Sequence, residues 1–344
     1  MIGSPISTPR NNPERRKRFA VLLLLAILGL VGLLLPAAAW FAVTQPVMFR
    51  GAAGDDRPPV DAARLEAHVR MLSETFTPRD AGHPENLDRV AAYLRKEFER
   101  ANAFAVAEQL FESRGRTYRN VIASFGPRAN ELIVVGAHYD TAGALPGADD
   151  NASGVAGLLE LAHLLGRTTP AARVELVAFA LEEPPYFRSP SMGSAIHAAS
   201  LKGQGFAVRA MMSLEMIGYF SDQPDSQQYP VSVLKAFYPT RGNFITVVGK
   251  IDQGRVVRRV KKAMMEASPL PVYSINAPRS IPGVDFSDHL NYWNEGYNAL
   301  MITDTAFYRN RHYHTSADTP DTLDYERMAS VVQGVYAAVL SLAK

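Results

Sequence analysis

Residues 138–154, HYDTAGALPGADDNASG, place one histidine, three aspartates and one asparagine on a backbone that contains three glycines and a proline. Neutral imidazole and carboxylate oxygen are ligands that suit zinc. Because the chain has no cysteine, any metal must be held by histidine, aspartate and glutamate. A solvated turn and a calcium loop are alternatives, although the segment lacks the alternating acids and closing glutamate of an EF-hand. The segment alone does not decide between them.

Acids or histidine also follow other apolar runs. ELIVVGA leads into His138 and Asp140, VELVAFAL into Glu182 and Glu183, MMSL into Glu215, and NALMIT into Asp304. A His-x-Asp or Glu-Glu pair by itself usually has an ordinary structural explanation. However, ligand sites of open α/β sheets form just beyond the carboxyl ends of the strands, so these side chains are expected to converge. Adjacent acids point in different directions, so one can bind a metal while the other acts as general base on a water.

The elements that would position these residues alternate along the chain. Helical spacing of apolar residues is found near 61–76, 86–102, 153–166, 192–201, 254–266 and 325–342. Strands are expected at 104–111, 118–125, 131–138, 174–181, 210–217, 243–249 and 298–305. This alternation predicts an α/β fold, a three-layer α/β/α sandwich around a mixed, mostly parallel sheet, in one catalytic domain over residues 61–344.

The N-terminal region has a different composition. Residues 1–18 hold five basic groups and one acid, and 25 uncharged residues follow at 19–43. A run of this length can span a membrane as one helix, and the basic flank predicts a cytoplasmic N-terminus. A cleaved signal peptide, processed at AAAW (37–40), is the alternative; both place the domain outside the cytoplasm, and cleavage of residues 1–39 would make it secreted. Residues 44–60, rich in glycine, proline and charge, are expected to be a linker.

The net charge of the rest of the chain indicates which classes of binding partner to expect. Removing residues 1–18 from totals of 36 basic and 34 acidic residues leaves 31 and 33, a net charge of −2. A nearly neutral domain argues against nucleic acid as a partner. The oligomeric state cannot be read from the sequence.

Five ordered blocks resemble the dizinc aminopeptidase family, which comprises bacterial leucyl aminopeptidases and, as relatives, glutamate carboxypeptidase and glutaminyl cyclase. The blocks are GAHYDT, PGADDNASG, ALEE, SLEMIG and YHTSADTPDTL, and the resemblance spans about residues 85–342. It implies the phosphorylase/hydrolase-like sandwich, two zinc ions per chain and peptide substrates. It also implies the ligands His138, Asp150, Glu183, Glu215 and His314, with Asp150 bridging both ions.

The same resemblance assigns two further roles. Glu182 would be the general base, and Asp140 would orient the imidazole of His138 by a hydrogen bond to its far nitrogen. Glu215 departs from the aspartate that many relatives carry. Asp288 and His289 would line the substrate pocket or cap the following helix. Apart from the resemblance, Tyr308 is a candidate for substrate contact because it precedes His314 on a loop. His289 as a ligand is less favoured than His314.

The leading hypothesis is therefore a membrane-anchored, metal-dependent aminopeptidase that cleaves the N-terminal peptide bond. The alternative is a glutaminyl-cyclase-like acyltransferase that uses zinc to form N-terminal pyroglutamate. A glutamate-type carboxypeptidase ranks third, because the chain has no room for that branch's large inserted domains. A non-catalytic receptor or scaffold would require lost ligands, and all of them are present.

Overall fold

The computed structural model describes residues 13–47 and 57–344, and the side chains of these residues except Pro13 and Arg15. Residues 1–12 of the expected cytoplasmic segment and 48–56 of the expected linker lie outside the described residues. Within the described part, eight strands form one sheet in the order β1-β2-β4-β3-β5-β8-β6-β7. Their bounds are β1 Ala105–Ser113, β2 Arg116–Phe125, β3 Glu131–His138, β4 Arg173–Phe179, β5 Ala207–Glu215, β6 Ile245–Gly249, β7 Val272–Asn276 and β8 Ala299–Thr303.

The sheet is mixed, as expected. Strands β4, β3, β5 and β8 run parallel to one another, and β6 is parallel to β7. The pairs β1–β2, β2–β4 and β6–β8 are antiparallel. The carboxyl ends of the four central parallel strands therefore meet at one edge, where the sequence placed the acids and histidine.

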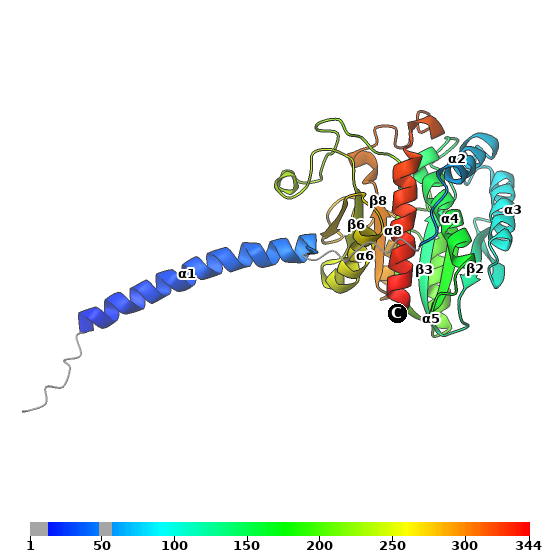
Figure 1. Ribbon diagram of the computed structural model, residues 1–344. Helices are drawn as coiled ribbons and strands as arrows, with labels where there is room; N and C mark the ends of the chain where they lie inside the picture. The colour runs from blue at the N-terminus through cyan, green and yellow to red at the C-terminus, as the bar shows by residue number, and fades with distance from the viewer. Residues whose placement is uncertain (1–12, 48–56) are drawn as a thin grey trace, which may run out of the picture.

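Helices cover both faces and complete the three-layer sandwich (Figure 1). One layer contains α2, α3, α4, α6 and α8, and the other contains α5 and α7. Their bounds are α2 Ala62–Arg70, α3 Pro84–Arg100, α4 Gly154–Gly166, α5 Gly193–Gly203, α6 Gly254–Ala267, α7 His289–Asn294 and α8 Tyr325–Ala343. Short turns are η1 Met71–Thr75, η2 Ala148–Ser153, η3 Ser232–Ala236, η4 Ile251–Gln253, η5 Ala306–Tyr308 and η6 Pro320–Thr322.

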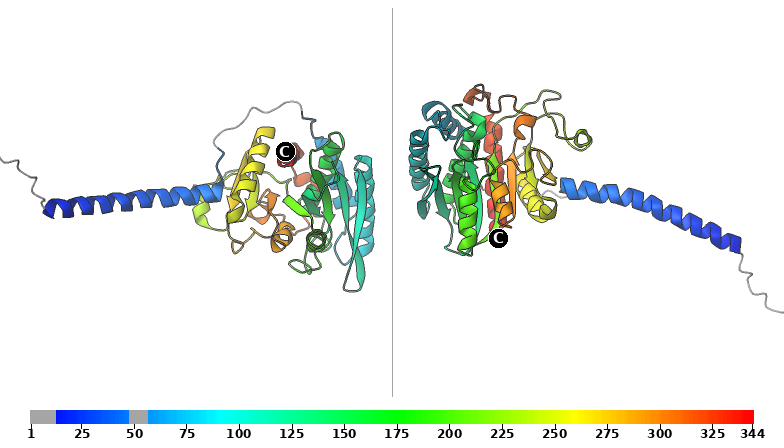
Figure 2. Two further views of the ribbon diagram at one scale, coloured as in Figure 1. Left: turned by 90° about the horizontal axis from the view of Figure 1, so that it is seen from below. Right: turned by 180° about the vertical axis from the view of Figure 1, so that it is seen from behind.

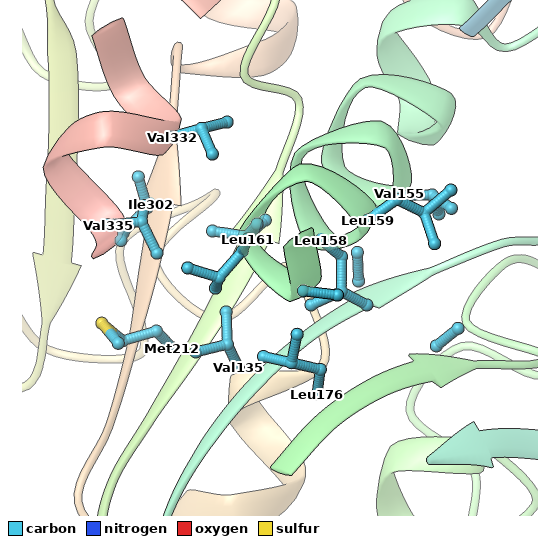
Figure 3. Packing of buried hydrophobic residues seen from close by; sticks show 14 of the residues in the cluster. Val135, Val155, Leu158, Leu159, Leu161, Leu176, Met212, Ile302, Val332 and Val335 are labelled. Carbon is cyan, nitrogen blue, oxygen red and sulfur yellow. The ribbon is translucent and has the colours of Figure 1, made fainter. Parts of the chain in front are cut away.

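The larger core lies between the sheet and the layer of α4 and α8. Figure 3 shows side chains of these helices packed on residues of β3, β4, β5 and β8. Helix α4 follows the Asp150 loop directly, and its Val155, Leu158 and Leu161 are fully buried. Burial of each such side chain contributes about 1.5–3 kcal/mol, which fixes the helix and the loop before it against the sheet.

Two elements were not expected from the sequence. Strand β7 is only five residues long, and α7 is a six-residue helix, both too short to show a clear period.

The boundary after the apolar N-terminal segment also differs from the expected one. Helix α1, Pro13–Thr44, extends the expected 19–43 at both ends, and Thr44 and Gln45 are buried against the domain where a linker was expected.

Helix α1 projects away from the domain (Figures 1 and 2). Its segment Arg16–Thr44 is long and apolar enough to cross a membrane. A signal sequence near an N-terminus has the same properties, so anchor and signal both remain interpretations of this helix.

Candidate metal centre

His138 ends β3 and is 1% exposed. Its Nε2 atom lies 3.4 Å from Asp150 Oδ1 and 3.5 Å from Glu215 Oε2. Glu215 is the last residue of β5, the neighbour of β3 in the sheet, and Asp150 is in the loop that leads from β3 to α4. The three side chains offer ligand atoms close enough to hold one ion.

A second group shares Asp150. The other carboxylate oxygen, Oδ2, lies 3.0 Å from His314 Nε2, which in turn is 3.3 Å from Glu183 Oε1. The ring of Tyr313 stacks on the His314 imidazole with centroids 3.8 Å apart and so limits its rotation. These three side chains could hold another ion. Asp150 therefore faces one histidine with each of its oxygens, which is the arrangement of a carboxylate between two cations.

Glu182 and Glu183 follow β4 and are both buried. Asp140 holds their backbone, because its two oxygens each accept a hydrogen bond of 3.1 Å, one from Glu182 N and one from Glu183 N. The contact expected between Asp140 and His138 differs in detail. The backbone carbonyl of Asp140 is 3.2 Å from His138 Nδ1, whereas its carboxylate is 3.6 Å away.

Glu182 lies beside the first group, with Oε2 4.0 Å from His138 Nε2. The structure thus brings together all five expected ligands and the expected general base. Their roles as ligands and base stay predictions.

The Asp150 loop is fixed by two residues that sequence reasoning missed. Asp318 accepts hydrogen bonds from the backbone N–H groups of Asp149 and Asp150, at 2.9 and 3.1 Å. Arg79 is fully buried and donates to the carbonyls of Leu72, Pro146 and Gly147. Both residues lie far from the loop in sequence, so no local pattern marks them.

Asn151 ties the same loop to the end of β5. Its side-chain amide donates to Leu214 O at 2.8 Å, and its oxygen accepts from Met216 N at 3.1 Å. These bonds bracket Glu215 on both sides in the sequence. Ser287 completes the support, because its hydroxyl donates to Glu215 Oε2 at 2.6 Å.

The two remaining acids near this edge hold loops. Asp149 accepts hydrogen bonds from Gly218 N and Asn310 Nδ2, at 3.0 and 2.8 Å. Asp304, the strand-end acid of β8, accepts from Tyr219 N and Ala306 N, both at 2.9 Å. Neither belongs to a group of side chains that could hold an ion among the described residues.

The electrostatics of the cluster fit divalent cations. Burial, reinforced by the neighbouring acids, raises the pKa of Glu182 well above its ordinary value and that of Glu183 to about 7. Burial opposes charge on His314, but its bonds to Asp150 and Glu183 raise its pKa to about 10. Asp288 is a further fully buried carboxyl group near this cluster, and burial raises its pKa to about 7. Several carboxylates buried close together are costly, and bound cations would neutralise them.

An apolar pocket opens beside Glu215. It has a volume of about 810 Å³ with its open mouth included. The walls are aromatic and aliphatic, and include Tyr238, Phe244, Met301 and Tyr308. Of the three residues expected to contact substrate, Tyr308 lines this pocket.

The other two residues lie elsewhere. Asp288 is fully buried and lies outside the pocket wall; it precedes α7 but makes no capping hydrogen bond. His289 is also fully buried; its Nε2 is 2.9 Å from Val284 O and its ring contacts Trp293 edge-on, with centroids 4.4 Å apart. His289 is therefore a packing residue of α7 in this structure.

His138, Glu182 and Glu183 form a third group of possible ligands within the same cluster. A group outside the cluster, His68, Glu160 and His163, lies between α2 and α4. Arg64 already engages both oxygens of Glu160, with Nε 2.6 Å from Oε1 and Nη2 2.9 Å from Oε2. The guanidinium neutralises this buried carboxylate and would repel a cation. We interpret the group as an ion pair with two neighbouring histidines.

Comparison with known proteins identifies relatives of this chain. The family model described as peptidase family M28 matches residues 120–339. The uncharacterized protein YfbL of Escherichia coli (strain K12) is 51% identical over 280 residues, which cover 79% of this chain and 85% of YfbL. A probable leucine aminopeptidase 1 of Trichophyton verrucosum (strain HKI 0517) is 27% identical over 239 residues, 65% of this chain and 58% of that protein.

Solved structures show the same fold. LapB from Legionella pneumophila superimposes with a TM-score of 0.66 at 22% identity, over 83% of this chain and 72% of LapB. A glutaminyl cyclase from Bacteroides thetaiotaomicron, bound to N-acetylhistamine, gives a TM-score of 0.63 at 20% identity, over 83% of this chain and 99% of the cyclase. At these identities the likeness concerns the fold alone.

Proposed function

Because the chain belongs to peptidase family M28, we propose that it is a membrane-anchored aminopeptidase that removes the N-terminal residue of peptides with two zinc ions. The observation that carries the proposal is the position of Asp150, which faces His138 with one oxygen and His314 with the other. Two ligand groups that share a carboxylate fit a pair of divalent ions. The probable leucine aminopeptidase 1 among the relatives supports the choice of reaction.

The proposed ligands are His138, Asp150 and Glu215 for one ion and Asp150, Glu183 and His314 for the other. When bound, such ions polarise a substrate carbonyl and lower the pKa of an attacking water. Glu182 would take the proton of that water and return it to the departing amine. Asp140 would hold Glu182 and Glu183 in position through their backbone N–H groups.

The pocket supports an exopeptidase that prefers an apolar first residue. Glu215 borders it, so the free amino group of a substrate can lie beside the ion that His138, Asp150 and Glu215 would hold, while the side chain enters between Tyr238 and Phe244. Burying apolar surface stabilises binding by about 25 cal/mol per Å². A charged first side chain would lose hydration among walls that are mostly apolar.

Glutaminyl cyclization is the second candidate, because a solved cyclase shares the fold over nearly its whole length. The two reactions give different products. In the test, the purified full chain is supplied with zinc and incubated in separate reactions. The substrates are the leucyl, alanyl and glutamyl chromogenic amides and a peptide that begins with glutamine.

Release of leucine that stops on chelation, together with about two equivalents of bound zinc, supports the aminopeptidase. Formation of pyroglutamate without cleavage would instead establish the cyclase. The matched control is Glu182→Gln, which should keep the zinc and abolish release.

A further inference from the structure

The C-terminal end of helix α1 packs against the domain. The carbonyl of Thr44, its last residue, accepts hydrogen bonds from Lys261 Nζ at 2.9 Å and Ser274 Oγ at 2.7 Å. Gln45 follows, and its Oε1 accepts from Arg258 Nη2 at 2.5 Å. The end of α1 is thereby fixed to α6 and to β7, the edge strand of the sheet.

The length of α1 determines how far this junction would lie from the hydrocarbon core of a membrane. Twenty helical residues from Phe19 span the hydrocarbon core of about 30 Å and end near residue 38. Trp40 and Phe41 then lie at the interface, where aromatic residues are favoured. Thr44 is six residues beyond the core, about 9 Å for an upright helix and less for a tilted one, at the outer edge of the headgroup layer. If α1 spans the membrane, the domain rests directly on the lipid surface.

A loop between β5 and β6 projects to the same side of the molecule. Figure 1 and the right view of Figure 2 show it, with the single turn η3, reaching out beside the C-terminal end of α1. The side chains of the loop are divided between two environments. Leu234 and Tyr238 are buried and line the apolar pocket, whereas Val233 and Phe237 are 62% and 48% exposed.

Basic groups lie in this loop and on α6, to which the end of α1 is fixed. Lys235 lies between Val233 and Phe237 and is exposed. Arg255 is exposed in the first turn of α6, and Arg258 packs over the ring of Phe41 with its guanidinium carbon 4.6 Å from the centroid. Exposed apolar side chains with a lysine between them match the boundary between acyl chains and anionic headgroups.

We propose that residues 231–237 form a second contact with the bilayer, in which Val233 and Phe237 enter the interface next to α1. With the loop on one side of the fixed junction, the domain is held in a single orientation, and the wall of the apolar pocket borders the membrane surface. This inference rests on the anchoring by α1 and does not depend on the reaction catalysed.

The absence of cysteine from the chain permits a direct test. The full chain is placed in nanodiscs of phosphatidylethanolamine and phosphatidylglycerol, and an environment-sensitive fluorophore is attached to Val233→Cys, Phe237→Cys or the control Lys96→Cys. Lys96 is exposed on α3, at the far side of the domain from α1. The labels at 233 and 237 should emit at shorter wavelength than the control label. They should also lose most of their fluorescence to lipids that carry a shallow quencher, whereas the control label should not. Labels at 233 and 237 that behave like the control would overturn the proposal.

A second variant separates insertion from mere proximity. A label on Ala236→Cys is compared between the natural loop and the double substitution Val233→Ser and Phe237→Ser, which leaves Leu234 and Tyr238 in place. Quenching should fall sharply in the double variant while intact mass and nanodisc capture show that α1 still anchors the chain. Equal quenching in both loops would refute a role for the two apolar side chains. Neither measurement uses substrate, so a failure here is distinguishable from a failure of the aminopeptidase proposal.

Discussion

Replacement of Asp140 by asparagine tests whether this residue holds the two glutamates. Asp140 is 1% exposed, and its carboxylate accepts one hydrogen bond from Glu182 N and one from Glu183 N. Asparagine keeps one acceptor oxygen but turns an NH₂ group toward the other N–H. One buried donor then loses its partner, at a cost of about 1–3 kcal/mol, and the remaining bond is no longer charge-assisted, at a cost of about 1 kcal/mol.

We therefore expect Asp140→Asn to lower the free energy of unfolding by about 2–4 kcal/mol. The lost charge acts in the opposite direction, because it relieves repulsion within the acidic cluster. Urea unfolding is therefore compared at one fixed excess of zinc, where bound cations neutralise these carboxylates. Turnover should fall strongly as well, because Glu182 and Glu183 lose their fixed position.

Asp225→Asn is the matched control, because Asp225 is exposed. This control should unfold within about 0.5 kcal/mol of the unaltered protein. If Asp140→Asn also stays within that margin and keeps its activity, Asp140 does not position the two glutamates.

Three other perturbations have definite expected outcomes. Glu182→Gln should retain bound zinc, measured by elemental analysis, while hydrolysis of leucyl amides is lost. Asp150→Ala should weaken both metal sites in a zinc titration, whereas Glu215→Ala should weaken one, and equal losses would contradict the shared role of Asp150. Burial lowers the pKa of His289 to about 4 from an ordinary 6.5; the unfolded chain therefore takes up the proton first as pH falls. Stability should drop between pH 6.5 and 4 by up to about 3 kcal/mol, and His289→Gln should remove this part of the pH dependence in urea unfolding.

The positions of the principal site residues could be anticipated because they lie at strand ends. His138 and Glu215 are the last residues of β3 and β5, and Glu182 and Glu183 follow β4 by three and four residues. Apolar runs identify such strands in a sequence, and the parallel arrangement brings their ends to one edge. The convergence of these side chains thus follows from the order of elements and requires no knowledge of individual contacts.

The residues that support the site could not be anticipated in the same way. Arg79, Asn151 and Asp318 act through hydrogen bonds to backbone groups that are distant in sequence, such as Asp318 to Asp149 N over 169 residues. A polar side chain that binds backbone has no required partner type, so neither spacing nor charge pattern identifies it. The short β7 and α7 were missed for a related reason, since five or six residues are too few to establish a period.

The glutamate at position 215 illustrates how the two kinds of residue depend on each other. Its side chain is one methylene longer than the aspartate that the resemblance leads one to expect, and a longer arm has more rotational freedom to lose on binding a metal. The structure limits that freedom, because Ser287 donates to Oε2 at 2.6 Å and is itself 2.8 Å from Ser213 Oγ. Held in this way, Oε2 lies 3.5 Å from His138 Nε2, about the separation of two ligands on one tetrahedral zinc. The departure from the family pattern is therefore compatible with a metal ion held by His138, Asp150 and Glu215, and the serine that positions Glu215 lies 72 residues away in the sequence.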